Sequence, residues 1–256
     1  MSNSNLVSYT RISPNKNTHR NHKIDTITIH CMAGQLSVES CGNVFANPSR
    51  EASSNYGIGS DGRIALYVDE GDRSWCSSNS ANDNRAVTIE VASDSTAPYA
   101  VKTAAYNALI ELVADICKRN GIERLVWSTD KKIRVGHLNG TNMTVHRDFA
   151  NKACPGEYLY SRMGEIAALV NAKIAPQQAV STQQELTPVI NSTGSFKIKT
   201  KDNMNVRKGP GTIYPRTKTI AKKGQVFTII EQKGNWGRLL SGAGWINISS
   251  VYATRV

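Results

Sequence analysis

The first two thirds of the chain alternate between two spacings of apolar residues. Residues 23–30 (KIDTITIH) place apolar and polar side chains alternately, which predicts a strand that ends in His30. Residues 64–68 (IALYV) and 86–91 (AVTIEV) are also predicted strands, and Glu90 lies on the polar face of the second one. These segments are expected to supply the sheet of a first domain.

Other segments have the spacing of amphipathic helices. Residues 37–45 (SVESCGNVF) predict a short helix with Ser37 as its N-cap. Residues 101–121 carry one continuous apolar stripe, and residues 158–172 carry another. Strands that alternate with helices predict a layered α/β domain, with a central mixed β-sheet flanked by helices.

The composition changes near residue 175. Residues 175–193 contain two prolines, four glutamines and few apolar residues, which predicts a linker. The remaining residues, 194–256, show no helical spacing, and short β-branched runs (FKIKT, QVFTIIEQ, GRLL and AGWINI) are separated by Gly, Pro and Asn. This pattern predicts a small all-β barrel. We therefore expect a first domain at 1–174, a linker at 175–193 and a second domain at 194–256.

The overall composition is that of folded, globular protein. Hydrophobic residues make up 39% of the chain and charged residues 20%. No apolar run approaches the ~20 residues that a membrane span needs. The first residues, MSNSNLVSYTRISPNKN, have neither a basic start nor an apolar block, so we expect no signal peptide and synthesis in a cytoplasm.

Positive charge is concentrated in the last third of the chain. Residues 1–174 hold 19 Lys and Arg against 17 Asp and Glu, a balance of +2. Residues 175–256 hold 12 against 3, a balance of +9. A basic surface at one end indicates an anionic partner, which by charge alone is nucleic acid, acidic lipid or an acidic wall polymer.

Residues that bind metals are grouped in the stretch TVHRDFANKACPG, residues 144–156. It contains His146 and Cys154, and with His30 these residues make two imidazoles and one thiolate, a zinc-ligand set that leaves the fourth position to water. A structural role for each residue remains an alternative, because nothing in the spacing links His30 to this loop. The five cysteines are an odd number at irregular spacing, which predicts free thiols rather than a disulfide framework.

Four stretches, in this order, resemble the type 2 N-acetylmuramoyl-L-alanine amidase family: TITIHCMAG, SSNYGIGSDGRIALYVDE, AVTIEVASD and TVHRDFANKACPG. The family includes phage endolysins and is related to peptidoglycan recognition proteins, and the resemblance covers roughly residues 20–172. It implies that His30, His146 and Cys154 bind Zn²⁺. His137 is the alternative to His146, but it lacks the K-A-C-P-G sequel.

The resemblance also implies catalytic roles. Glu90 would take a proton from the attacking water and pass it to the leaving amine, and Lys152 would stabilise the charge on the tetrahedral intermediate. One branch of the family has a catalytic tyrosine shortly before the D-G turn, where this chain has Ser54. Tyr56 follows two residues later, so the chain resembles the branch that relies on glutamate, and Tyr56 is expected to line the cleft.

Three further residues are predicted to contact substrate, namely Thr141, Asn142 and Arg147. The bond cut would be the amide between the lactyl group of N-acetylmuramic acid and L-alanine.

Residues 204–252 resemble bacterial SH3-like wall-binding domains, through N-V-R-x-G-P-G-T, K-G-Q-x-F and a closing G-W-I-x-x-x-Y. Tyr214, Trp236 and Tyr252 are predicted to form an aromatic groove, whereas Trp245 is expected in the barrel core. The basic balance favours teichoic acid phosphates or peptidoglycan carboxylates as the bound polymer.

The expected function is that of a monomeric, zinc-dependent phage endolysin, which is bacteriolytic and degrades Gram-positive walls. It would stay in the host cytoplasm until it is released to the cell wall. One alternative is a wall-targeted cysteine peptidase, with Cys31 or Cys41 as nucleophile and His137 or His146 as base. Another is a non-catalytic peptidoglycan-binding protein. A nucleic-acid binder would leave the zinc-ligand set unexplained.

Overall fold

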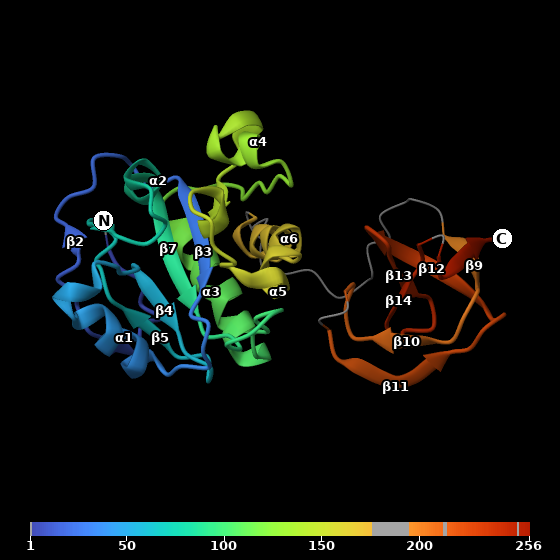
Figure 1. The fold of residues 1–256 in the computed structure, drawn as a ribbon. Coiled ribbons are helices and arrows are strands. Elements are labelled where there is room, and N and C mark those ends of the chain that lie inside the picture. The colour runs from blue at the N-terminus through green and yellow to red at the C-terminus, as the bar shows by residue number, and fades with distance from the viewer. Residues whose placement is uncertain (1, 176–194, 212–213, 250) are drawn as a thin grey trace, which may run out of the picture. The chain divides into compact units, whose positions relative to one another are not determined.

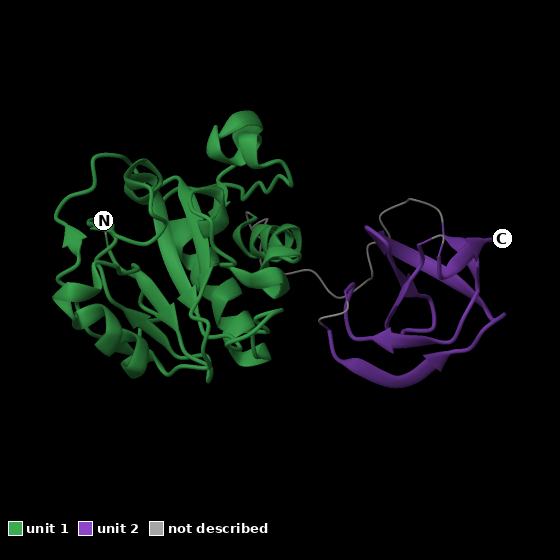
Figure 2. Cartoon of the chain, in the orientation of Figure 1, with its two compact units in different colours: residues 1–180 green, residues 181–256 purple. Residues whose placement is uncertain are grey.

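The computed structural model describes residues 2–175, 195–211, 214–249 and 251–256. The chain divides into two compact units, residues 1–180 and 181–256 (Figure 2). The predicted linker, apart from its first residue, lies outside the described residues. Among the described residues, no helix combines the length and apolarity of a membrane span.

A six-stranded mixed sheet is the centre of the first unit, with strand order β1-β5-β4-β7-β3-β8. β3 is parallel to both of its neighbours, β7 and β8, whereas β4 and β5 are antiparallel. Two short strands, β2 and β6, form a separate antiparallel pair. The strands are β1 (Tyr9–Thr10), β2 (Lys16–Asn17), β3 (Thr26–Cys31), β4 (Tyr56–Ile58), β5 (Ile64–Leu66), β6 (Arg73–Ser74), β7 (Ala86–Val91) and β8 (Met143–Val145).

Helices cover both faces of this sheet, as predicted (Figure 1). α3 and α6 belong to the main hydrophobic core with β3 and β7, whereas α1 packs with β5 in a smaller core. The helices are α1 (Val38–Ala46), α2 (Ser80–Arg85), α3 (Thr103–Arg119), α4 (Lys131–Val135), α5 (Gly156–Tyr160) and α6 (Met163–Ile174), and the 3-10 helices are η1 (Pro48–Arg50), η2 (Leu138–Gly140) and η3 (His146–Asp148).

The predicted helices are present, and one of them is interrupted. The side chain of Ser37 accepts a hydrogen bond from the Ser40 backbone N–H, which confirms it as the N-cap of α1. The single helix predicted at 158–172 is two helices, because the chain turns between α5 and α6. The apolar spacing continues across this turn, so the pattern alone does not reveal it.

Alternation along β3 and β7 separates the core from the polar face of the sheet. Ile27 and Ile29 are fully buried in the main core. On the other face His30 lies opposite Glu90 in the parallel register. Other polar residues on this face are hydrogen-bonded to one another. The Thr28 and Thr144 hydroxyls, for example, are 2.7 Å apart. A buried polar group costs little free energy once it is hydrogen-bonded, so this face can carry a polar site.

The second unit is a seven-stranded antiparallel sheet of order β11-β10-β14-β13-β12-β9-β15, which confirms the all-β prediction. Its strands are β9 (Phe196–Thr200), β10 (Met204–Arg207), β11 (Arg216–Ala221), β12 (Val226–Lys233), β13 (Trp236–Leu239), β14 (Trp245–Asn247) and β15 (Ala253–Arg255). The sequence pattern did not predict β10, β11 and β15. β11 is mostly exposed at the edge of the sheet, so it lacks the apolar alternation of a half-buried strand.

Candidate active site

His30, His146 and Cys154 come together at the carboxyl edge of the first sheet. His30 lies in β3, and His146 directly follows β8, the parallel neighbour of β3. Their ligand atoms, with the Cys154 sulfur, all lie within 4.8 Å of one another. The distance from Cys154 Sγ to His30 Nδ1 is 3.5 Å. Parallel pairing of β3 and β8 therefore brings together residues that are far apart in the sequence.

The surroundings favour the neutral imidazoles that bind metal ions. His30 is fully buried, and this burial, followed by the neighbouring His146, lowers its pKa well below the usual value. Burial and then the charge of Lys152 lower the pKa of His146. The Ser78 hydroxyl lies 3.2 Å from His146 Nε2 and orients the ring. His137 is not part of this group.

Glu90 lies beside this group with a carboxylate that lacks a partner. Its Oε2 atom is buried and makes no hydrogen bond to any described residue. Burial, and to a smaller extent the nearby Cys31 thiol, raises the pKa of Glu90 to about 8. A buried acceptor without a partner is costly and often marks a functional group. Here it faces His30, with which it shares the register of neighbouring strands.

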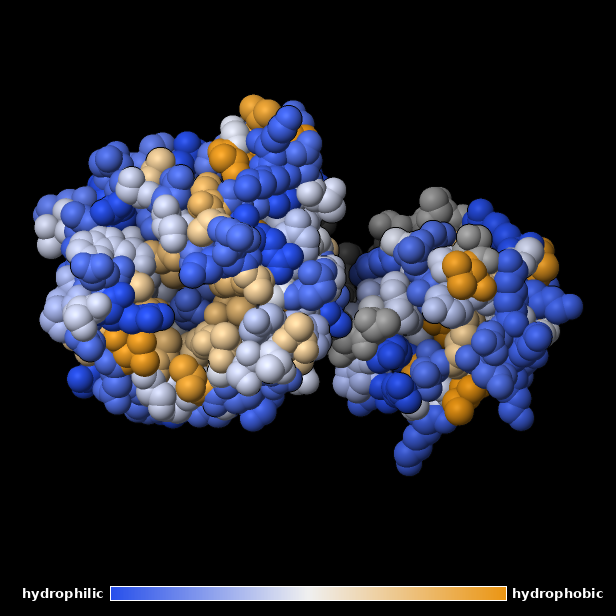
Figure 3. Space-filling model, in the orientation of Figure 1, coloured by the Kyte–Doolittle hydropathy of each residue, from blue (hydrophilic) through white to orange (hydrophobic). Residues whose placement is uncertain are grey.

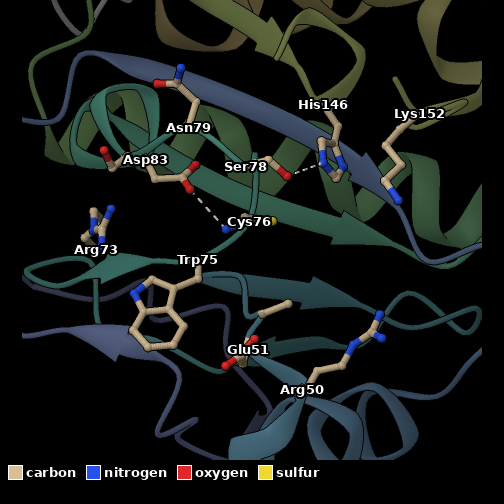
Figure 4. A pocket seen from close by; sticks show the side chains of 12 residues that line it. Arg50, Glu51, Arg73, Trp75, Cys76, Ser78, Asn79, Asp83, His146 and Lys152 are labelled. Carbon is tan, nitrogen blue, oxygen red and sulfur yellow. Dashed lines mark hydrogen bonds between the residues drawn. The ribbon is translucent and has the colours of Figure 1, made fainter. Parts of the chain in front are cut away.

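A cleft of about 480 Å³ opens beside His146 and extends along the first unit (Figure 4). His146 and Lys152 lie toward one end, and Arg73 and Trp75 lie toward the other. Figure 3 shows the surface hollowed over the strands of the first unit. The lining residues are Arg50, Glu51, Ala52, Arg73, Trp75, Cys76, Ser78, Asn79, Ser80, Asp83, His146 and Lys152.

The model of the N-acetylmuramoyl-L-alanine amidase family matches residues 20–157, more than half of the chain. The chain belongs to this family. A bacterial SH3 domain model matches residues 202–252, so the amidase domain is followed by a bacterial SH3 domain. No sequence among the curated proteins matches the chain.

Solved structures that are similar to this chain have low sequence identity to it. The hydrolase AmiA from Staphylococcus aureus, in complex with its ligand, is 19% identical with a TM-score of 0.50, over 68% of this chain and 85% of AmiA. The endolysin N-acetylmuramoyl-L-alanine amidase LysCS from Clostridium intestinale URNW is 15% identical with a TM-score of 0.46, over 67% of this chain and 99% of LysCS.

Cys76 is a residue of the amidase cleft that the sequence analysis did not identify. It lines the cleft, and ligand atoms of Cys76, His30 and Glu90 lie within 4.8 Å of one another. Burial raises its pKa well above the usual value, and the charge of Glu90 adds to this effect. No motif surrounds Cys76, so only the folded structure reveals its place.

The structure contradicts the prediction that Tyr56 lines the cleft. The side chain is fully buried, and its hydroxyl donates to Glu70 Oε1 at 2.6 Å and accepts from the Ser4 backbone N–H. Glu70 in turn pairs with Arg119 at 2.6 Å. Tyr56 therefore stabilises the interior around this ion pair.

Thr141 and Asn142 bond to the backbone in this structure, and their contacts with substrate stay predictions. The buried Thr141 hydroxyl donates to backbone carbonyls of Ile133 and Leu138, which closes the turn after α4. The Asn142 amide bonds to the backbone at residues 124 and 126. Both residues support loops, and neither lines the cleft.

Arg147 remains a predicted substrate contact. Its Nη2 donates to the Ala153 carbonyl at 2.6 Å, and its guanidinium lies 4.3 Å from the centre of the Tyr160 ring. These contacts connect the two ends of the loop between His146 and Cys154.

A buried ion pair fixes the start of the same loop. Arg134 donates to both carboxylate oxygens of Asp148, at 3.0 and 2.5 Å, and Asp148 also accepts from the Val145 N–H. Only 2% and 1% of the two side chains are exposed. Asp148 lies two residues after His146, so the pair holds this part of the metal group in place.

We expect Arg134→Met to destabilise the protein by about 3–5 kcal/mol, because the Asp148 carboxylate stays buried without its partner. Urea unfolding measures the change. The control is Arg63→Met, since the Arg63–Glu39 pair is largely exposed and its loss should change the stability little. Equal effects of the two substitutions would contradict the assigned role of the buried pair.

In the second unit, Tyr214 and Tyr252 are exposed, Trp236 is half-buried and Trp245 is buried as expected. A Cβ atom at Gly209 would lie 2.3 Å from the Tyr214 ring, so the glycine permits this ring to pack on the backbone. The aromatic groove remains a prediction.

Proposed function

We propose that the chain is a zinc-dependent amidase of the endolysin type, which cleaves the bond between N-acetylmuramic acid and L-alanine in Gram-positive walls and lyses the phage host after its release from the cytoplasm. Residues 1–174 would catalyse, and residues 194–256 would bind the wall. The observation that carries this proposal is the grouping of His30, His146 and Cys154 beside Glu90, at a cleft in a member of the amidase family.

The donor set fits zinc. Two imidazoles and one thiolate are ligands that Zn²⁺ prefers, and three protein ligands leave a position for water or substrate. The hydrogen bond with the Cys31 side chain and burial raise the pKa of Cys154, so binding of zinc would have to release its proton. The Cys31 backbone N–H, which donates to Cys154 Sγ at 3.4 Å, favours the thiolate that would then form. When bound here, zinc would polarise the scissile carbonyl and lower the pKa of a water molecule.

The protein's own groups would handle the proton and the developing charge. A carboxylate with a pKa near 8 is a suitable proton acceptor at neutral pH, and Glu90 would pass the proton to the amine of the released L-alanine. Lys152 is exposed at the cleft beside His146 and would stabilise the negative charge on the carbonyl oxygen. Ser78 would keep the His146 ring in its orientation.

The cysteine peptidase alternative gains no support. Burial raises the pKa of Cys41, a residue of α1 that packs in the smaller core, so the thiol does not suit a nucleophile. The hydrogen bond with Cys154 lowers the pKa of Cys31 to about 7, but Cys31 is buried and does not line the cleft, so a substrate carbonyl would not reach it there.

Mass spectrometry of digested Gram-positive peptidoglycan tests the proposal. We expect stem peptides with a free N-terminal alanine and intact glycan strands. Cuts within the peptides would instead support a peptidase. Wall binding without any release would support the non-catalytic reading.

We also expect salt-sensitive wall binding through the second unit. Full-length Glu90→Gln protein, which should leave walls intact, is sedimented with purified walls at low and high salt. Reversing the exposed Lys197 and Lys199 of β9 to glutamate should weaken low-salt binding at least about fivefold, because exposed charges attract an anionic polymer.

The matched control reverses Lys131 and Lys132, which are exposed in α4 of the first unit. If the control lost wall binding equally, the second unit would not be the specific site of wall binding.

A further inference from the structure

The end of the cleft distant from His146 and Lys152 is formed by the β2–β6 pair. Asn17 lies directly opposite Arg73 in the antiparallel register. The Asn17 Oδ1 atom accepts a hydrogen bond from Arg73 Nη2 and another from Trp75 Nε1, the latter at 2.6 Å. One amide oxygen therefore holds both large side chains of this end of the cleft. The family match begins at residue 20, so Asn17 lies outside it.

Both neighbours of Arg73 are anchored. Asp72 forms an ion pair with Lys16 at 2.6 Å and accepts the His19 backbone N–H at 2.9 Å. The buried Ser74 hydroxyl lies 2.7 Å from the Thr88 hydroxyl in β7. The backbone at Arg73 is thus fixed to the sheet that carries Glu90, and Asn17 fixes its guanidinium.

The cleft carries unbalanced positive charge. Arg50, Arg73 and Lys152 line it, and none of them forms an ion pair with a described residue. Two acidic residues also line it, so the excess is one positive charge: Glu51 is exposed, and Asp83 is buried and accepts the backbone N–H groups of residues 76 and 77. Beyond its bond to Asn17, the Arg73 side chain makes no hydrogen bond to any described residue, so most of its five N–H donors are available.

We propose that Arg73, positioned by Asn17, binds a free carboxylate of the substrate's stem peptide. This inference rests on the proposed function. In a muramoyl peptide the peptide part carries carboxylates, whereas the sugar is neutral once its lactyl group is in the amide. A guanidinium whose orientation is fixed binds a carboxylate through two parallel charge-assisted hydrogen bonds, which is the strongest pairing that this side chain makes. Arg73 would therefore select peptides by their charge.

Three synthetic muramoyl peptides test the proposal with the full-length, zinc-loaded protein. The first carries free carboxylates at its second residue and at its C-terminus, and each of the others has one of these replaced by a carboxamide. We expect one replacement to raise KM about tenfold or more with little change in kcat, since a charge-assisted hydrogen bond is lost. In Arg73→Gln and in Asn17→Leu, the ratio of KM between carboxamide and carboxylate should fall toward one.

Arg63→Gln is the control, because Arg63 pairs with Glu39 and Asp61 and does not line the cleft. It should keep the wild-type ratio. The proposal is overturned if the wild type treats all three peptides alike, or if the ratio survives Arg73→Gln. If Arg73→Gln and Asn17→Leu lowered kcat equally on every peptide, the two residues would have a structural role instead. Failure of the proposed function is distinct, because the wild type would then release no alanine-terminated peptide from any of the three.

Discussion

Cys154→Ala is expected to reduce bound zinc from about one ion per chain to nearly none and to lower amide hydrolysis at least about 10³-fold. The group His30, His146 and Cys154 offers three protein ligands, so the loss of one leaves an incomplete set. Polarisation of the carbonyl and activation of water are together worth several kcal/mol, and about 4 kcal/mol corresponds to a factor of 10³. Elemental analysis and peptide release from peptidoglycan measure the two effects.

A buried thiol elsewhere provides the control. Cys117→Ala removes a fully buried sulfur from α3 in the main core, and the variant should keep its zinc and its activity. In the wild type, a chelator should abolish activity and added zinc should restore it. Activity that survives complete removal of the metal would refute the zinc mechanism.

The sequence predicted local structure well and distant contacts poorly. Alternating residues in β3 and β7 and the apolar stripe of α3 identify those elements, because each pattern has the period of its own backbone. The approach of His30 to His146 depends on the pairing of β3 with β8, in which Ile27 lies opposite Met143. No local period encodes this register, so residue types only suggested the metal group, and the family resemblance was needed to link His30 to the loop.

Tyr56 shows why a polar residue near a motif is hard to assign. β4 has only three residues, all buried, so alternation does not reveal which side chain faces the cleft. The partners of the Tyr56 hydroxyl are Glu70 and the backbone of Ser4, which are distant in sequence. Its position was therefore not predictable from the residues around it.

The hydrophobic pattern also gives no sign of how the N-terminal segment packs. Its composition is polar, yet the buried Arg20 guanidinium donates to backbone carbonyls of residues 70, 72, 83, 84 and 86. Asn15 likewise bonds to the backbone at residues 45 and 47. Hydropathy detects segments that pack through apolar contact, and this one packs through hydrogen bonds instead.

Glu90→Gln should retain zinc and the fold but hydrolyse the substrate about 10²–10⁴-fold more slowly, because an amide cannot accept the proton of the attacking water. The charge state of Glu90 also affects stability. Its folded-state pKa of about 8 lies above the usual 4.5, so the folded protein holds this proton over the intervening pH range. The contribution of Glu90 to stability should therefore fall as pH rises from about 4.5 to 8.

In the metal-free protein, urea unfolding at several pH values should show this fall for the wild type and a flatter profile for Glu90→Gln. Glu39→Gln is the matched control, since Glu39 is an exposed partner of Arg63 and its pKa is lowered to about 2, chiefly by the hydrogen bond from Arg63. A lowered pKa acts in the opposite sense: the Glu39 contribution is present above its unfolded pKa and is lost as the solution becomes more acidic. Glu39→Gln should thus keep the wild-type activity, and its stability should still fall between pH 4.5 and 8. If Glu90→Gln hydrolyses peptidoglycan at the wild-type rate, another group must take the proton, even where the pH profile of stability changes as expected.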